Sequence, residues 1–196
     1  LHIISNFVDT ELYNSSVLSS EIPECFKKSN TKLKIIYAGN IGIFQDWIPL
    51  IYASKKLINE NIEFWIIGEG SKKSFLENLI IKNSLKNIKV FPYQNRKLMP
   101  SINNLADIHF IITNKEMENE GFPSKVYTIM ACSKPLIVVS GNGTPLHNFL
   151  IDKNCSELIT SNRNESFLKS IIKLKNNKKL RNSLGKNGFD IIEKKY

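Results

Sequence analysis

The sequence predicts an α/β domain in which a parallel sheet carries helices on both faces. Short apolar runs rich in β-branched residues alternate with longer amphipathic runs, and the alternation repeats at least five times along the 196 residues. Several of the apolar runs contain no regular polar positions, which is typical of strands covered on both faces. A chain of this length with 42% hydrophobic residues can bury a full core without disulfides or a structural metal.

Six apolar runs are expected to be the strands, because each is short and most are followed by turn-forming residues. In chain order they are Leu33–Ala38, Glu63–Ile67, Ile88–Phe91, Ile108–Ile112, Leu136–Val139 and Ser156–Thr160. The polar stretch 14–31, broken by Pro23, is interpreted as a surface connection ahead of the first strand.

Seven longer runs are expected to be helices. In chain order they are Asp46–Asn59, Ser71–Asn83, Lys97–Leu105, Pro123–Cys132, Pro145–Ile151, Asn164–Lys175 and Lys178–Lys195. Ser71 and Asn164 are expected N-caps, with Glu165 at the positive end of its helix. Pro123 and Pro145 are expected in first turns, where the missing N–H has no partner within the helix.

The formal net charge of +9 makes nucleic acid and anionic membranes the first partners to consider. Only Arg96, Arg163 and Arg181 are arginines, and the densest cationic cluster, Lys169–Lys186, contains no aromatic ring. Both features disfavour nucleic-acid binding, which relies on bidentate arginine and base stacking. The cluster can contact acidic lipid headgroups or simply be solvated, and the sequence leaves both interpretations open.

The three cysteines indicate a reducing compartment. Cys25, Cys132 and Cys155 are odd in number and far apart, so they provide neither a CxxC metal half-site nor an evident disulfide framework. The sequence contains no apolar run of the roughly 18 residues that span a bilayer and no signal-peptide layout near its start. We therefore expect a soluble cytoplasmic protein. Because the chain begins at Leu1 and stops at Tyr196 inside a helical pattern, we also expect a piece of a longer protein.

Ligands of an open parallel sheet bind beyond the carboxyl ends of its strands. Glycines follow four of the first five expected strands, in the stretches Gly39–Gly42, Gly68–Gly70, Gly121 and Gly141–Gly143. One such loop needs no explanation beyond a turn, but four at one edge favour a phosphate-bearing ligand. The sequence contains no dinucleotide fingerprint, P-loop, nucleophile elbow, HExxH motif or Asp-x-Asp pair. We expect neither a metal nor a cofactor.

The stretch 116–135 is the most informative part of the sequence. Glu118 and Glu120 precede an expected helix that carries Ser124 and Lys125 in its first turn. Carboxylates there can accept hydrogen bonds from sugar hydroxyls, while Ser124, Lys125 and the helix N–H groups can face phosphate oxygens. The alternative is that the two glutamates only complement the helix dipole in solvent.

Taken together, these motifs resemble family 4 of the GT-B glycosyltransferases, retaining enzymes that use a nucleotide-sugar donor. The resemblance covers nearly the whole chain, but only the C-terminal, Rossmann-like, donor-binding half of that fold. It is carried by Ile4–Asp9, the glycine loops Tyr37–Gly42 and Ile67–Gly70, and the segments Glu120–Tyr127 and Ala131–Pro135. The last two segments are especially similar to the branch that assembles bacterial O-antigen and capsule polysaccharides.

The resemblance implies roles for individual residues. Glu120 matches the first carboxylate of the family's Glu-x7-Glu pattern, near the donor sugar, and Lys125 lies near the diphosphate; both are expected to be catalytic. The other expected contacts to the nucleotide sugar are Gly39, Asn40, Gly42, Gly68, Pro92, Tyr93, Glu118, Gly121, Phe122, Pro123, Ser124 and Thr128, with Pro92 and Tyr93 beside the base. The sequence departs from the family at two places. Thr128 replaces the second glutamate, and Ile43–Asp46 stands where the family has a basic residue.

The same resemblance implies a domain organisation and partners. Residues 1–30 form an interdomain connector and loop, 31–177 the donor-binding domain, and 178–196 a C-terminal helix. The implied partners are a nucleoside diphosphate sugar, a saccharide or lipid-linked acceptor, and a GT-B N-terminal domain, in cell-surface polysaccharide synthesis at the inner membrane face. The alternative is a non-catalytic nucleotide-sugar binding module, which Thr128 favours. A GT-B-like sugar-nucleotide 2-epimerase needs additional carboxylates and histidines that the sequence does not place.

Overall fold

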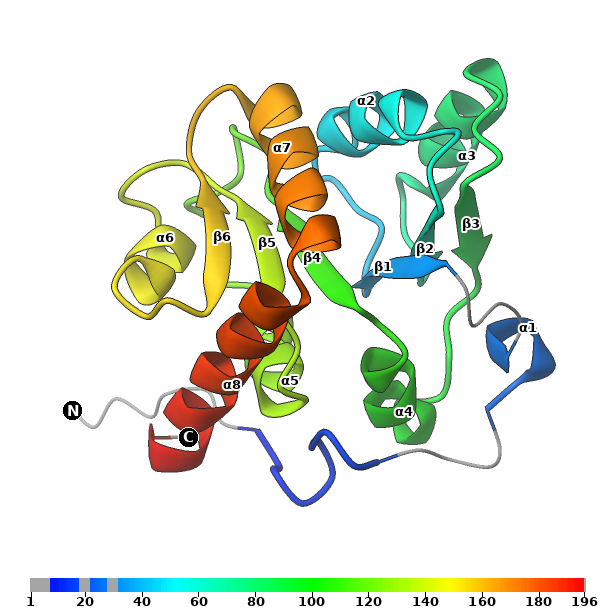
Figure 1. The fold of residues 1–196 in the computed structure, drawn as a ribbon. Helices are drawn as coiled ribbons and strands as arrows, with labels where there is room; N and C mark the ends of the chain where they lie inside the picture. Colours follow the sequence, from blue (N-terminus) through cyan, green and yellow to red (C-terminus); the bar gives the residue numbers. More distant parts are fainter. Residues whose placement is uncertain (1–7, 18–21, 28–31, 196) are drawn as a thin grey trace.

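The computed structural model describes residues 8–17, 22–27 and 32–195, and in them a six-stranded sheet lies between two layers of helices (Figure 1). The strands are β1 (Leu33–Ala38), β2 (Ile62–Ile67), β3 (Ile88–Phe91), β4 (Ile108–Ile112), β5 (Leu136–Val139) and β6 (Ser156–Ile159). Their order across the sheet is β3-β2-β1-β4-β5-β6, and every neighbouring pair is parallel. The predicted fold class and all six predicted strands are confirmed, with β2 and β6 shifted by one residue at one end.

Strand β1 pairs with β2 along its whole length but with β4 over only two residues. With β2 it is in register along its whole length, from Leu33 opposite Ile62 to Ala38 opposite Ile67. With β4 the ladder contains only Ile35 opposite Ile108 and Ile36 opposite His109. The carboxyl ends of β1 and β4 therefore lie beyond the last ladder pair between them.

The helices divide between the two faces of the sheet (Figure 1). One face is covered by α2 (Ile48–Lys56), α3 (Lys73–Lys82) and α7 (Arg163–Asn176), and the other by α1 (Glu24–Lys27), α4 (Met99–Asn104), α5 (Lys125–Ala131) and α8 (Lys178–Lys195). The short 3-10 helix η1 (Arg96–Leu98) precedes α4, and α6 (Pro145–Leu150) lies beside β6.

Two apolar layers hold these helices on the sheet. Alternate residues of each buried strand enter opposite layers, as Phe110 and Ile111 of β4 do. Phe110 packs in the layer of α2 and α7, with its ring centre 5.6 Å from that of Phe167. Ile111 packs in the layer of α5 and α8, which contains Met130 and Ile192. Runs without polar alternation are therefore required by burial on both faces.

Two predicted helix starts are wrong, and tertiary contacts explain one of them. Lys72 occupies the N-cap position of α3, so Ser71 is not its cap; the N–H of Lys72 donates to Ile41 O at 2.9 Å, which ties this turn to the β1 loop. At α7 the N-cap is Asn162, in a left-handed conformation with φ 45°, so Asn164 lies inside the first turn. Glu165 is in that first turn, as predicted.

The two proline predictions have different outcomes. Pro145 is in the first turn of α6, as predicted. Pro123 precedes α5, which begins at Lys125 with Ser124 at its N-cap, so this placement was wrong. The helix predicted over Asp46–Asn59 is shorter, because Asp46 lies ahead of α2 and its Oδ1 accepts a hydrogen bond from the Ile48 N–H at 3.0 Å.

The stretch 14–31 is not only a loop, since it contains the four-residue helix α1. Phe26 of α1 is buried and its ring centre lies 4.7 Å from that of Phe91 and 5.6 Å from that of Trp65. Residues 18–21 and 28–31 of this stretch, and residues 1–7 of the predicted connector, lie outside the described residues. Of residues 8–17, Val8 and Tyr13 are buried against the α5 layer.

Within residues 8–17, 22–27 and 32–195, the helices include none that combines the length and apolar character needed to cross a membrane. Cys25 is exposed and Cys132 and Cys155 are buried, and all three are free thiols.

Candidate functional site

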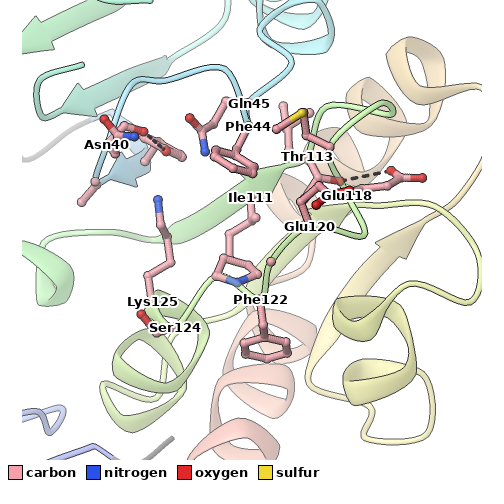
Figure 2. Close-up of a pocket in the computed structure, with 17 residues that line it drawn as sticks. Asn40, Phe44, Gln45, Ile111, Thr113, Glu118, Glu120, Phe122, Ser124 and Lys125 are labelled. Atoms are coloured by element: carbon pink, nitrogen blue, oxygen red, sulfur yellow. Dashed lines mark hydrogen bonds between the residues drawn. The ribbon is translucent and has the colours of Figure 1, made fainter. Parts of the chain in front are cut away.

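A pocket of about 480 Å³ opens at the carboxyl edge of the sheet, between the ends of β1 and β4. Strand order reverses between these two strands, because the chain runs outward from β1 to β3 on one side and from β4 to β6 on the other. Parallel sheets bind ligands at this kind of reversal. The lining residues are Tyr37, Ala38, Gly39, Asn40, Phe44, Gln45, Ile111, Ile112, Thr113, Met117, Glu118, Glu120, Gly121, Phe122, Pro123, Ser124 and Lys125 (Figure 2).

Lys125 is the only cationic side chain among these lining residues. Its Nζ lies 3.8 Å from the centre of the Tyr37 ring, and a Cβ added at Gly39 would come within 2.5 Å of it. Figure 2 shows the amine directed toward the loop that carries Asn40. Burial lowers the pKa of Lys125 to about 7, and no carboxylate among the described residues forms an ion pair with it. The amine is therefore free of protein partners, and an anionic ligand beside it would favour its charged form.

Tyr37 provides a rigid surface beneath this amine. Its hydroxyl donates to Asn40 O at 2.5 Å, and its ring meets Trp47 edge-on with centres 5.0 Å apart. Burial raises the pKa of Tyr37 well above its usual value, so the phenol stays neutral. A neutral aromatic face attracts a cation without neutralising it, which holds Lys125 in place and leaves its charge for the ligand.

The loop after β1 forms one wall of the pocket and is fastened to the end of β4. Gln45 and Thr113 form an isolated antiparallel bridge, and the N–H of Asn114 donates to Phe44 O at 2.8 Å. The Gln45 side chain turns back to accept a hydrogen bond from the N–H of Gly42 at 2.9 Å. This segment, in which the sequence lacks the expected basic residue, instead presents the half-exposed ring of Phe44 to the pocket.

The two glutamates of the pocket are in different electrostatic situations. Glu118 is 12% exposed and its Oε2 forms an ion pair with Nη2 of Arg163, while it also accepts from the N–H of Gly141 at 2.9 Å and from Thr113 Oγ1 at 3.3 Å. Glu120 is exposed, and among the described residues no hydrogen bond or ion pair involves its carboxylate. Glu120 is thus the carboxylate that a neutral, hydroxyl-rich ligand can reach.

The first turn of α5 contributes less to the pocket than its sequence suggests. The N–H of Val126 donates to Pro123 O at 3.0 Å and the N–H of Tyr127 to Ser124 O at 3.1 Å. These two amides are therefore already bonded within the turn. The side chain of Ser124 is exposed and makes no capping hydrogen bond, so its hydroxyl can face a ligand.

A family model described as "Glycosyl transferases group 1" matches residues 19–190. The chain belongs to the group 1 glycosyltransferases. This confirms the resemblance to GT-B glycosyltransferases that the glycine loops and the stretch 116–135 carry. The matched range includes all the residues that line the pocket.

Relatives and solved structures of other glycosyltransferases agree with this assignment. The chain is 29% identical over 117 residues to the Escherichia coli (strain K12) glycosyl transferase WcaI, whose name links it to colanic acid biosynthesis, and 29% identical over 161 residues to glycosyltransferase MJ1178 of Methanocaldococcus jannaschii. The matches cover 60% and 79% of this chain but 29% and 44% of those two proteins. The chain thus spans less than half the length of these curated relatives.

Two solved structures share the fold of this group 1 glycosyltransferase chain. The C-terminal domain of LpcC from Francisella tularensis superimposes with a TM-score of 0.73 at 18% identity, covering 96% of this chain and 98% of that domain. Anabaena HepE, solved with UDP and glucose, gives a TM-score of 0.82 at 14% identity and covers 100% of this chain but 52% of HepE. At these identities the comparison establishes the fold, which is that of a C-terminal GT-B domain.

Nine of the residues expected at a glycosyltransferase donor site line the pocket. They are Gly39, Asn40, Glu118, Glu120, Gly121, Phe122, Pro123, Ser124 and Lys125. They come from two loops far apart in sequence, after β1 and after β4, which the parallel sheet brings to one edge. Phe122 also anchors its loop, because its ring packs against Phe149 with centres 5.3 Å apart.

The other five expected residues do not line this pocket. At Gly68 a Cβ would lie 1.9 Å from Gly39 O, so this glycine permits close packing of the β1 and β2 ends. The Gly42 N–H is bonded to Gln45, as described above. Thr128 Oγ1 donates to Lys125 O at 3.0 Å within α5. Pro92 and Tyr93 follow the edge strand β3, and Tyr93 is 69% exposed.

Sequence reasoning missed the residues that complete the pocket. Among them, Tyr37, Phe44, Gln45, Thr113 and Met117 line it beside the expected positions. Tyr37 and Thr113 were visible as the residues at or next to strand ends, where side chains point into the crevice. Arg163 carried no signal at all, because its contact with Glu118 joins residues 45 positions apart.

Proposed function

We propose that this chain is the donor-binding half of a retaining GT-B glycosyltransferase and that the β1/β4 pocket binds a nucleoside diphosphate sugar. One observation carries the proposal. Two ionisable groups, Lys125 and Glu120, lie in one pocket at the strand-order reversal, and neither forms an ion pair with another described residue. Lys125 offers an unpaired ammonium for the diphosphate, and Glu120 offers an unpaired carboxylate for sugar hydroxyls.

In this proposal Lys125 acts on the leaving group. The bond between the anomeric carbon and the diphosphate oxygen breaks, and its electron pair remains on the diphosphate. The sugar passes to an acceptor hydroxyl, whose proton goes to the departing diphosphate. Lys125 stabilises the charge that develops on the diphosphate, and it does so in a partly buried position where such charge stabilisation is stronger than in water. Glu120 orients the sugar through its hydroxyls.

The remaining parts of the proposal concern what lies outside the pocket. A saccharide or lipid-linked acceptor in cell-surface polysaccharide synthesis is supported by the similarity to WcaI. A sugar-nucleotide donor is supported by the likeness to HepE, which has also been solved with UDP-glucose. A preceding GT-B domain, with residues 1–30 as its connector, is supported by the coverage of about half of HepE. The lysines of α8, including Lys178, Lys179 and Lys186, suit peripheral contact with an anionic cytoplasmic membrane face.

Calorimetric titration of this chain with UDP, GDP and ADP in metal-free buffer tests the proposal. We expect saturable binding of one of the three diphosphates. Lys125→Ala is expected to weaken it by about tenfold or more, because a charge-assisted hydrogen bond contributes roughly 1.5–3 kcal/mol. Glu120→Ala is expected to leave the free diphosphate affinity nearly unchanged and to weaken the corresponding nucleotide sugar.

Matched controls lie in the same loop. Lys115→Ala and Glu116→Ala remove one charge each from exposed positions that do not line the pocket. If Lys115→Ala weakens the diphosphate as much as Lys125→Ala, the interaction is a general effect of net charge and the proposed site is wrong. Binding of none of the three nucleotides would also count against the proposal.

A second candidate, a non-catalytic nucleotide-sugar binding module, is favoured by one observation. Thr128 stands where the family has its second glutamate, and its hydroxyl is bonded inside α5 and does not line the pocket. Such a module would bind the nucleotide sugar without cleaving it. Slow release of free sugar from the bound donor, lost in Lys125→Ala, would support the transferase; intact donor after prolonged incubation would support the module.

A further inference from the structure

Arg163, at the first position of α7, lies outside every motif described above, yet it forms the most buried ion pair among the described residues. Its side chain is 7% exposed and that of its partner Glu118 is 12% exposed. The guanidinium makes two contacts with the segment after β4: Nη1 donates to Thr113 O at 2.6 Å, and Nη2 bonds Glu118 Oε2. A planar guanidinium fixes both contacts at once, which a lysine cannot do.

The carboxylate of Glu118 connects three separate parts of the chain. Its Oε2 receives Arg163 from α7, the Gly141 N–H from the loop after β5, and Thr113 Oγ1 from the end of β4. We call these four residues, Thr113, Glu118, Gly141 and Arg163, the Glu118 hub. Arg163 and the Gly141 N–H donate to this oxygen, and the single Thr113 hydroxyl proton is shared between it and Val139 O, which lies 3.1 Å from Thr113 Oγ1. With these donors and little exposed surface, Glu118 is already engaged by the protein itself.

Gly141 lies so close to Glu118 that its position has no room for a side chain. A Cβ at this position would lie 1.9 Å from Glu118 Oε1 and 2.7 Å from its Cδ. Any larger residue would therefore displace the carboxylate from the hub. The close approach of backbone to carboxylate is what permits the Gly141 N–H bond of 2.9 Å.

The Glu118 hub lies where it can hold the segment 114–124, which we call the pocket loop. The segment 114–124 contains no helix or strand, and Asn114 ties its beginning to the β1 loop while Phe122 packs its end against Phe149. Glu118 is bonded to other elements midway between these points, two residues before Glu120. Arg163 is itself held in place, because its helix α7 packs along α2. In the same helix, Glu165 accepts a hydrogen bond from the Tyr52 hydroxyl.

We infer that Arg163 and Glu118 are positioning residues: through the Glu118 hub they hold the 114–124 loop so that Glu120 stays at the donor pocket. Neither residue is required to touch the ligand. The part of the inference that concerns ligand affinity rests on the proposed function, whereas the part that concerns loop order does not.

The test compares three variants by hydrogen exchange and by UDP titration. In Arg163→Met we expect the amides of 115–122 to exchange about tenfold faster, because local opening loses the contacts that oppose it. We expect UDP affinity to fall by about fivefold, since ordering the loop then accompanies binding. Glu118→Met/Arg163→Met removes both charges, and replacing a buried ion pair by apolar side chains restores stability.

The double variant separates positioning from ordinary structural support. If the hub positions the loop, exchange of 115–122 stays fast in the double variant although its melting temperature returns toward the wild-type value. If loop exchange and UDP affinity recover together with stability, the positioning role is refuted. Lys173→Gln is the matched control, because it removes an ion pair to Glu157 from the same helix, far from the pocket loop along α7.

Two safeguards keep the outcome decisive. Should Arg163→Met fail to fold, Gly141→Ala displaces Glu118 while keeping both charges, and it is expected to speed exchange of 115–122 in the same way. Should the wild-type chain bind no UDP, the proposed function fails on its own test, and loop exchange alone decides this inference. Exchange of 115–122 that is no faster in Arg163→Met or Gly141→Ala than in Lys173→Gln would overturn it.

Discussion

Two cationic side chains stand at the carboxyl edge of the sheet, and the protein treats them in opposite ways. The side chain of Arg163 is 7% exposed and is bonded to Glu118 and Thr113. Lys125 is partly buried on the ring of Tyr37 and, among the described residues, forms no ion pair. Both are withdrawn from water, but only the charge of Arg163 is neutralised by the protein.

The difference separates architecture from binding. A buried charge that is paired and hydrogen-bonded belongs to the folded framework, because removing either partner leaves the other uncompensated. A buried charge without a partner lowers stability, and a ligand of opposite charge relieves that penalty. The same logic distinguishes Glu118, which is bonded to Arg163, from Glu120, which is exposed and unpaired.

The largest expected effect on stability comes from breaking the ion pair between Arg163 and Glu118. Glu118→Met should lower the free energy of unfolding by about 3 kcal/mol, since it leaves Arg163 buried without its partner. Glu118→Met/Arg163→Met should recover to within about 1 kcal/mol of wild type. Urea unfolding followed by circular dichroism measures both. A loss below 1 kcal/mol in the single variant would show that the ion pair contributes little to the fold.

The next effect concerns Lys125, which has no ion-pair partner, and it is measured as the pH dependence of UDP binding. Burial lowers the pKa of Lys125 to about 7, so above this pH the amine must take up a proton before it can hold a diphosphate. UDP affinity should therefore fall with rising pH, approaching about tenfold per unit between pH 7.5 and 9. The phosphate's own titration near 6 lies below this window. Calorimetry in buffers of different ionisation enthalpy would report the proton taken up, and Lys125→Ala should abolish the slope.

A smaller effect of opposite sign is expected on stability. Lys125→Met keeps the apolar stem on Tyr37 and removes the unpaired charge, so it should raise the free energy of unfolding at pH 7 by about 1 kcal/mol. In the wild type the unfolded chain keeps this proton up to about its usual pKa of 10.5, while the folded chain loses it near 7. Stability should therefore rise with pH across that interval, and in Lys125→Met this rise should be absent. A variant less stable than wild type would mean that the cation–π contact outweighs the burial of the charge.

The smallest effect is expected from removing the exposed ion pair between Lys173 and Glu157, which serves as the reference for the buried pair. Lys173 is 57% exposed in its pair with Glu157, so solvent screens the interaction. Lys173→Gln should change the free energy of unfolding by less than about 0.5 kcal/mol and leave UDP binding unaltered. Thermal unfolding at low and high salt is sufficient to measure it. A change comparable to that of Glu118→Met would mean that burial does not distinguish the two ion pairs.

Much of the fold could be predicted because the governing signals are local. Strands buried on both faces must be apolar along their length, so Leu33–Ala38 and Ile108–Ile112 were delimited correctly from sequence. Helix ends were predicted less well, because contacts with other elements decide them. The turn before α3 is set by the hydrogen bond from Lys72 to Ile41 O, which joins residues 31 positions apart and leaves no trace in the local sequence.

The candidate site divides in the same way. The sequence by itself determined the parallel α/β architecture and, with it, that the residues after β1 and β4 share one edge of the sheet; Gly39, Glu120 and Lys125 were identified on that basis. Only the tertiary structure decided which of the charged groups are free. Whether a carboxylate or an ammonium is available depends on its immediate neighbours in space, and those neighbours, such as Arg163 for Glu118 and Tyr37 for Lys125, come from other parts of the chain.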